Sequence, residues 1–130
     1  MSKQQIQKAQ EKLEKALIAL KVALDAEKQD NRLNIDATIQ RFEFTIELFW
    51  KFLQRILNAK GVEVRFPKDV LKEAYAGKLI DDEQTWLAML HDKNVTSHTY
   101  DELQADIIYN HIKQYYPLLQ NSFNALIKQL

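Results

Sequence analysis

The chain contains no cysteine, and it has only two glycines and two prolines among its 130 residues. The absence of cysteine excludes disulfide bonds, thiolate nucleophiles and cysteine-ligated zinc. Glycine and proline are the residues that most disfavour a helix, so their scarcity favours helix along almost the whole chain. Because 46% of the residues are apolar, we expect residues 1–130 to form a single domain with one buried core.

Neither sign of charge is in excess, because 18 basic residues balance 18 acidic ones. With zero net charge the protein has no overall field that would attract nucleic acid, so any contact with RNA has to use a local patch. The N-terminal segment lacks the apolar stretch of a signal peptide, and no apolar run approaches the length of a membrane span. We therefore expect a cytoplasmic protein without a membrane partner.

Apolar periodicity and stop signals predict about five helices. They cover residues 2–27, 33–59 and 68–76, then a segment that contains Trp86, and finally a segment that starts after Thr99. Asp81 or Asp82 is expected to cap the fourth helix, and Pro117 to kink the last helix or divide it in two. The predicted fold is all-α, an antiparallel four-helix bundle with a short extra helix.

The second predicted helix carries more apolar surface than one buried face requires. One stripe consists of Phe42, Ile46, Phe49, Leu53 and Ile56, and a second of Phe44, Leu48 and Phe52, flanked by Arg41 and Arg55. Together they exceed the ~100° arc of an ordinary surface helix. Either this helix is central in the bundle, or its second stripe contacts another chain. Arginines beside aromatic residues are typical of interfaces, so we predict a homodimer contact through Arg41, Phe44, Leu48, Phe52 and Arg55.

The segment from Lys93 to Tyr100 has the highest density of reactive side chains. Its sequence, KNVTSHTY, combines a cation, an amide, three hydroxyl side chains, an imidazole and a phenol. Thr99 and Glu102 have the spacing of a capping box, which predicts that a new helix starts at Thr99. A break in the chain at Thr96 and Ser97 would let Lys93 and His98 converge beside the new helix N-terminus, where anions bind. We therefore predict a phosphate site.

A purely structural explanation of the same segment stays open. A histidine before an N-cap can pack on the first turn of the helix, and Lys93 with Asn94 can simply end the preceding helix. The other histidines, His91 and His111, have no partner at the spacing of metal ligands. The sequence thus predicts no metal site and no cofactor.

Three motifs in order resemble the HEPN superfamily, and in particular its branch of nucleotidyltransferase substrate-binding proteins. They are RFEFTIELFWKFLQ, FPKDVLKEAYAGKLIDDEQTW and MLHDKNVTSHTYDE, and the likeness extends from about Arg41 to Tyr116. Membership implies a helical bundle that forms homodimers and is encoded beside a protein with a minimal nucleotidyltransferase domain. Many such pairs are toxin–antitoxin systems, in which the HEPN protein is a metal-independent ribonuclease with an Arg-x-x-x-x-His motif, often followed by x-Tyr.

The resemblance assigns roles to individual positions of the segment. The family's arginine falls on Lys93, the polar residue after it on Asn94, the histidine on His98 and the tyrosine on Tyr100. In some pairs the partner adenylylates this tyrosine, so Asn94, Ser97 and Tyr100 are candidates for substrate or phosphate binding or for modification. Lysine is the departure, because it offers phosphate a flexible point charge where arginine offers a rigid fork.

Two functional hypotheses follow. The first is a HEPN subunit that binds a nucleotidyltransferase and presents or binds its substrate, RNA or a nucleotide. The alternative is a ribonuclease toxin in which His98 exchanges protons and Lys93 stabilises the charged phosphate. The lysine favours the first hypothesis.

Overall fold

The computed structural model describes residues 3–26, 32–98 and 101–130, and of residues 97 and 98 it describes the backbone alone. Five helices account for nearly all of this part: α1 (Lys3–Asp25), α2 (Leu33–Ala59), α3 (Pro67–Ala76), α4 (Glu83–His98) and α5 (Glu102–Gln129). Within the described ranges there is no strand, which confirms the all-α prediction. The expected bounds of the first three helices agree with the observed ones to within two residues.

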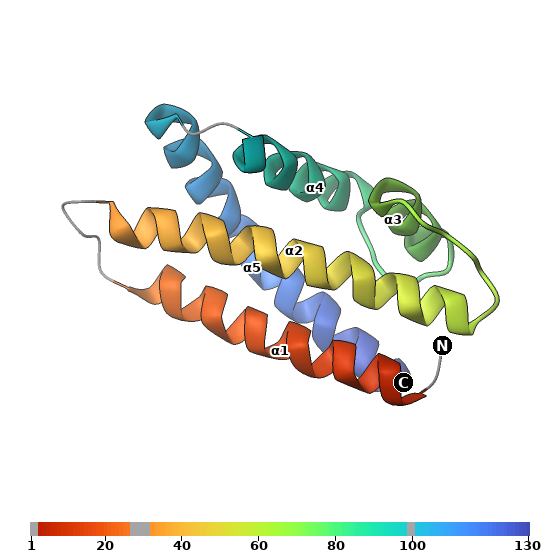
Figure 1. Ribbon diagram of the computed structural model, residues 1–130. Coiled ribbons are helices and arrows are strands. Elements are labelled where there is room, and N and C mark those ends of the chain that lie inside the picture. Colours follow the sequence, from red (N-terminus) through yellow and green to blue (C-terminus); the bar gives the residue numbers. More distant parts are fainter. Residues whose placement is uncertain (1–2, 27–31, 99–100) are drawn as a thin grey trace.

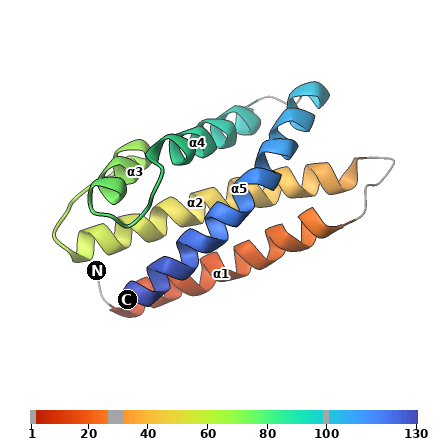
Figure 2. The ribbon, with the colours of Figure 1, turned by 180° about the vertical axis from the view of Figure 1, so that it is seen from behind.

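Helix α2 is the centre of the bundle. It packs against all four other helices, with α1 and α4 along two of its sides and α5 crossing behind it in the view of Figure 1. Figure 2 shows α5 from the opposite side, across α1 and α2, and the short α3 beside the C-terminal half of α2. The central position explains much of the wide apolar arc, because different faces of α2 meet different neighbours.

The two predicted apolar stripes of α2 differ in how far their residues are buried. Every residue of the first stripe is buried, as predicted: Phe42, Ile46, Phe49, Leu53 and Ile56 are at most 2% exposed. In the second stripe Phe52 is completely buried, with its ring centroid 6.3 Å from that of Phe123 on α5. Phe52 therefore belongs to this chain's own core, and its place in the predicted dimer contact is wrong. Leu48 is half-buried, whereas Phe44 is 61% exposed.

Helix α1 buries a row of small side chains. Three alanines of α1 are buried at intervals of seven residues, together with three leucines of the same helix: Ala9, Ala16 and Ala23 with Leu13, Leu17 and Leu20. Seven residues are almost two helical turns, so the alanines lie in a row along one side of the helix. The middle alanine, Ala16, lies close to α2, since its backbone carbonyl oxygen accepts a hydrogen bond from the Thr45 hydroxyl at 3.4 Å.

Helix α4 continues through the position where a break was expected. It is helical from Glu83 to His98, so the predicted interruption at Thr96 and Ser97 is wrong. The Thr96 hydroxyl donates to the carbonyl oxygens of Asp92 and Lys93, both at 3.1 Å. A threonine that bonds back to the preceding turn is compatible with a continuous helix.

The N-termini of α4 and α5 are capped by aspartates. Asp82 accepts a hydrogen bond from the Thr85 backbone N–H, so of the two predicted candidates it is Asp82 that caps α4. Asp101 is the N-cap of α5, with its carboxylate accepting from the N–H of Leu103 at 2.9 Å. The predicted N-cap, Thr99, lies outside the described residues, and the assignment of the cap to it is wrong.

The last helix contains Pro117 in its interior and is not divided by it. The expectation was a kink or a division, and of these two the division is wrong because one helix runs from Glu102 to Gln129. A proline costs one backbone hydrogen bond and crowds the preceding turn. The flanking side chains compensate, since Ile112 and Leu119 are fully buried on either side of the proline.

Candidate functional site

Lys93 extends from α4 toward α2 and forms an ion pair there. Its Nζ lies 3.2 Å from Oε2 of Glu47, and the two side chains are only 21% and 33% exposed. Position 93 is the place where the family resemblance puts a phosphate-binding cation. In this structure the cation already faces a carboxylate of the same chain.

Glu47 receives further donors on its own helix. The indole N–H of Trp50 donates to Oε2 at 3.0 Å, and the ammonium of Lys51 lies 3.2 Å from Oε1. Desolvation by burial raises the pKa of this carboxyl, but hydrogen bonds from Trp50, Lys93 and Lys51 together with the charge of Lys93 outweigh it and lower the pKa below its ordinary value. Glu47 is therefore a stable anion beside Lys93 at neutral pH.

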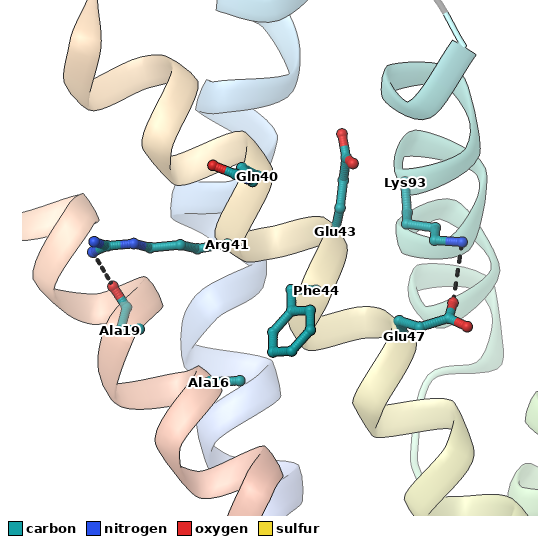
Figure 3. A pocket seen from close by; sticks show the side chains of 8 residues that line it. All are labelled: Ala16, Ala19, Gln40, Arg41, Glu43, Phe44, Glu47 and Lys93. Atoms are coloured by element: carbon teal, nitrogen blue, oxygen red, sulfur yellow. Dashed lines mark hydrogen bonds and ion pairs between the residues drawn. The ribbon is translucent and has the colours of Figure 1, made fainter.

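A groove of about 550 Å³ opens beside this ion pair. Its lining comes from three helices, namely Ala16 and Ala19 of α1, Gln40, Arg41, Glu43, Phe44 and Glu47 of α2, and Lys93 of α4. Figure 3 shows Lys93 and Glu47 pointing toward one another across the groove, with Phe44 projecting from α2 between α1 and α4. The groove combines an apolar floor with charges of both signs.

Residues that the sequence placed in two different sites share this groove. Lys93 was predicted as part of a phosphate site, and Arg41 and Phe44 as part of a dimer contact, yet all three line it. The guanidinium of Arg41 donates to the backbone carbonyl of Ala19 at 2.8 Å, which holds this side chain against α1. The other predicted interface residues, Leu48 and Arg55, continue along α2 and are half-buried.

The structure shows no break in the chain between Lys93 and His98, which the predicted convergence of these two residues required. The backbone is helical from Glu83 to His98. Residues five apart on a helix are separated by about 140° around its axis. Asn94 is exposed on α4, whereas Tyr100 and the side chains of Ser97 and His98 lie outside what the structure describes.

A polar cluster between α4 and α5 was not predicted. Asp92 is 8% exposed, and its Oδ2 accepts a hydrogen bond from the Tyr115 hydroxyl at 2.7 Å. The same oxygen lies 3.0 Å from Nδ1 of His111. The Tyr115 ring also stacks on Phe42 of α2, with centroids 5.8 Å apart. One buried carboxylate thus joins α4 to α5 immediately before Lys93.

The cluster raises the pKa of Tyr115 well above its ordinary value, first because the hydroxyl is desolvated and then because it donates to the Asp92 carboxylate. In the sequence, His111 and Tyr115 stand four apart and therefore share a helix face, which indicated that they lie together. Their acceptor could not be found that way, because Asp92 comes from another helix.

Carboxylates also line a second, smaller groove between α2 and the C-terminal half of α4. It measures about 390 Å³, and Asp36, Ile39, Gln40, Glu43 and Thr96 line it. With Glu47 this makes three acidic residues on the face of α2 that is turned toward α4. The field around Lys93 is therefore less favourable to phosphate than the sequence of α4 alone indicates.

By its structure the protein is an all-helical domain with a half-buried cation, Lys93, near the end of α4. An open groove lined by charges of both signs lies beside this cation. Comparison with known proteins gives the family. Residues 5–128 match the family described as nucleotidyltransferase substrate binding protein like. The chain therefore belongs to this branch of the HEPN superfamily, as the resemblance predicted.

Two relatives agree with this assignment. The chain is 38% identical over 101 residues to a probable ribonuclease HepT of Haemophilus influenzae, a match that spans 74% of this chain and 66% of that protein. It also resembles the crystal structure of a protein from Thermus thermophilus, with a TM-score of 0.80 and 37% identity over 88% of this chain and 98% of that one. The helical-bundle fold is thus shared with a solved structure.

Membrane insertion of a helix finds no support in the described part of the chain. None of its helices combines the length and the apolar character that a membrane span requires.

Proposed function

We propose that this protein is the HEPN subunit of a two-component system, in which it binds a nucleotidyltransferase and presents or binds that enzyme's substrate. The observation that carries the proposal is the match over residues 5–128 to the family described as nucleotidyltransferase substrate binding protein like. The Lys93–Glu47 ion pair weakens the case for cleavage, because the cation at the motif's arginine position is paired with a carboxylate of the same chain.

The assembly we propose is a homodimer that captures a minimal nucleotidyltransferase-domain protein in the cytoplasm, as in the toxin–antitoxin pairs of the resembling family. The test is co-expression of this chain, carrying an affinity tag, with the untagged reading frame encoded beside it. We expect both chains to elute together from the affinity column and from a sizing column in a fixed ratio. A chain that elutes without its neighbour at micromolar concentration contradicts the proposal.

Tyr100 is the residue that we propose as an acceptor of a nucleotidyl group. Its phenol oxygen would attack the α-phosphate of a nucleoside triphosphate held by the partner, forming a phosphodiester and releasing pyrophosphate. After incubation of the complex with ATP and Mg²⁺, intact-mass measurement should show added adenylyl groups, which Tyr100→Phe removes. Tyr75→Phe is the matched control, because Tyr75 is an exposed tyrosine of α3 and makes the same change of side chain outside the segment from Lys93 to Tyr100. Modification that persists in Tyr100→Phe rejects this role.

The second candidate function is a metal-independent ribonuclease, favoured by the likeness to a probable ribonuclease. The 2′-hydroxyl of RNA would attack the adjacent phosphorus and the 5′-oxygen would leave, giving a 2′,3′-cyclic phosphate, while His98 transfers protons and Lys93 stabilises the phosphorane. The experiment is incubation with RNA in EDTA. Cleavage that His98→Ala abolishes and His91→Ala retains supports it, and intact RNA with the wild-type protein rejects it.

A further inference from the structure

The connection between α2 and α3 contains a segment, residues 62–66, that is extended like a β-strand. Val62 and Val64 are half-buried and pack against the core, whereas Glu63 and Arg65, which alternate with them, are exposed. Exposure that alternates residue by residue is typical of an extended backbone, in which successive side chains point to opposite faces. Figure 1 shows the connection at one end of the bundle, where it joins the C-terminus of α2 to α3.

The backbone of this segment is hydrogen-bonded to α2 along one side only. The Val64 carbonyl oxygen accepts a hydrogen bond from Nε2 of Gln54 at 2.8 Å. In an extended chain the N–H and C=O groups of neighbouring residues point to opposite sides, so those of Glu63 and Arg65 are directed away from α2. Within the part of the chain that the structure describes, neither of these two residues forms a hydrogen bond or an ion pair. An unpaired edge of this kind can accept another strand.

The sequence of the segment is complementary to itself in the antiparallel register. If Val64 lies opposite Val64 of a second copy, Glu63 faces Arg65 of that copy and Arg65 faces its Glu63. Because Glu63 and Arg65 also carry the unused backbone groups, each of these pairs can exchange both of its N–H···O=C hydrogen bonds. The same register sets a carboxylate beside a guanidinium on each side of the two-fold axis, and such cross-strand pairs are stabilising.

Two further features fit the same occupant. Phe66 ends the segment with extended φ and ψ angles of −99° and 142°, and its side chain is 68% exposed. In the same register it lies opposite Val62 of the second copy, which can cover the ring. A groove of about 410 Å³ beside the segment leaves room for a second strand, and its lining carries charges of both signs: residues 63–66 with Asp69, Lys72 and Glu73 of α3.

We infer that two copies of this chain join edge to edge through residues 62–66, which form a short antiparallel ribbon centred on Val64. This contact is separate from the groove beside Lys93, because none of residues 62–66 lines that groove. It goes beyond the proposed function and does not depend on capture of a nucleotidyltransferase. A short two-stranded ribbon is only marginally stable in water, so the contact joins homodimers reversibly into larger assemblies as the protein concentration rises.

The absence of cysteine allows the register to be tested directly, because any cysteine that is introduced is the only one in its chain. One population carries Glu63→Cys and a second, lengthened by a tag, carries Arg65→Cys. After mixing and oxidation, the mixed disulfide dimer should exceed both symmetric dimers. Directly opposite residues have Cα atoms about 5.5 Å apart, within disulfide range, whereas diagonal neighbours are about 7–8 Å apart. Lys60→Cys, at an exposed position just before the segment, is the control and should crosslink weakly to either.

Exchange of charges gives the second measurement, by sedimentation across a concentration series. Glu63→Arg and Arg65→Glu each set like charges opposite one another, so each should weaken association by about tenfold. An equimolar mixture of these two variants restores opposite charges in every pair and should associate as the wild-type chain does. Glu14→Arg makes the same substitution at an exposed residue of α1 and should leave association unchanged.

Phe66→Ser tests the ribbon with little risk to the fold. Phe66 is the N-cap of α3 and makes no side-chain cap hydrogen bond, whereas serine is a favoured N-cap residue. The variant should therefore keep its thermal stability and still associate more weakly than the wild-type chain. Far-ultraviolet circular dichroism and thermal unfolding verify that it is folded.

The opposite results overturn the inference. Mixed and symmetric disulfides that form equally, or association that the mixture of charge variants does not restore, reject the register and the ribbon with it. A Glu63→Arg variant that associates as the wild-type chain does but no longer captures the nucleotidyltransferase assigns the segment to that partner. In that case the proposed function stands and the inference does not. Crosslinking in the predicted register by a chain that captures no nucleotidyltransferase supports the ribbon and rejects the proposed function alone.

Discussion

The ammonium of Lys93 lies 3.2 Å from the carboxylate of Glu47, so the cation in the candidate phosphate site is paired within its own chain. Glu47 also accepts from Trp50 and lies near Lys51, which holds its orientation. Any anion that approaches Lys93 therefore meets a fixed negative charge. This pair decides how well the groove accepts phosphate.

Glu47→Gln should strengthen the binding of a short single-stranded RNA at low salt. Removing one unit of negative charge about 6 Å from a bound phosphate changes its energy by roughly 0.7 kcal/mol in water, or about threefold in affinity. Fluorescence anisotropy with a labelled oligonucleotide measures it. Glu63→Gln is the control, because it makes the same change in net charge at an exposed residue outside the groove. Equal effects of the two variants would show that only net charge matters.

Asp92→Asn should destabilise the protein by about 1–3 kcal/mol, because it weakens a buried acceptor that serves Tyr115 and faces His111. Urea unfolding followed by circular dichroism gives the free energy. Tyr115→Phe and the double variant complete a mutant cycle, in which the two changes should be strongly non-additive. Additive effects would mean that the hydrogen bond contributes nothing of its own.

Alkaline pH should destabilise the protein through the cluster of Asp92, His111 and Tyr115. The pKa of Tyr115 is raised in the folded protein, so the neutral phenol is stabilised there relative to the unfolded chain. The resulting contribution to stability is complete below the unfolded pKa of about 10 and is lost as pH rises toward the folded value. The tyrosinate absorbance near 295 nm follows the titration. Tyr115→Phe should remove one late-titrating group from this absorbance change, and an unchanged late phase in that variant would contradict the assignment.

Phe52→Ala and Phe44→Ala should have different effects on stability, although both residues belong to the second apolar stripe of α2. Phe52 is completely buried, and its loss leaves a cavity that costs about 3–5 kcal/mol of stability. Phe44 is 61% exposed, so the same truncation should change the stability of the isolated chain by about 0.5 kcal/mol or less. Thermal or urea unfolding at a concentration where the chain is monomeric distinguishes them. Similar losses for both variants would contradict the burial pattern.

Helix positions were predictable because they depend on local signals. Gly61 and Pro67 bound α2 and α3, and the seam from Phe42 to Ile56 is buried as its spacing predicted. The continuity of α4 through Thr96 and Ser97 was not predictable in the same way. Thr99 and Glu102 have the spacing of a capping box, but Asp101 also can cap, and the side chain of Asp101 holds the N-terminus of α5. Two local signals competed, and the sequence does not rank them.

The sequence by itself determined a cysteine-free, all-helical, charge-balanced domain, because composition and periodicity act along the chain. The family resemblance added that Lys93 falls where the motif has arginine. Only the tertiary structure decided which groups meet across helices. It buried Phe52 and left Phe44 exposed, it placed Glu47 against Lys93, and it brought Asp92 to Tyr115. The physical reason is that such contacts depend on how α2 is shared among its four neighbours, and that arrangement follows from the packing of the whole core.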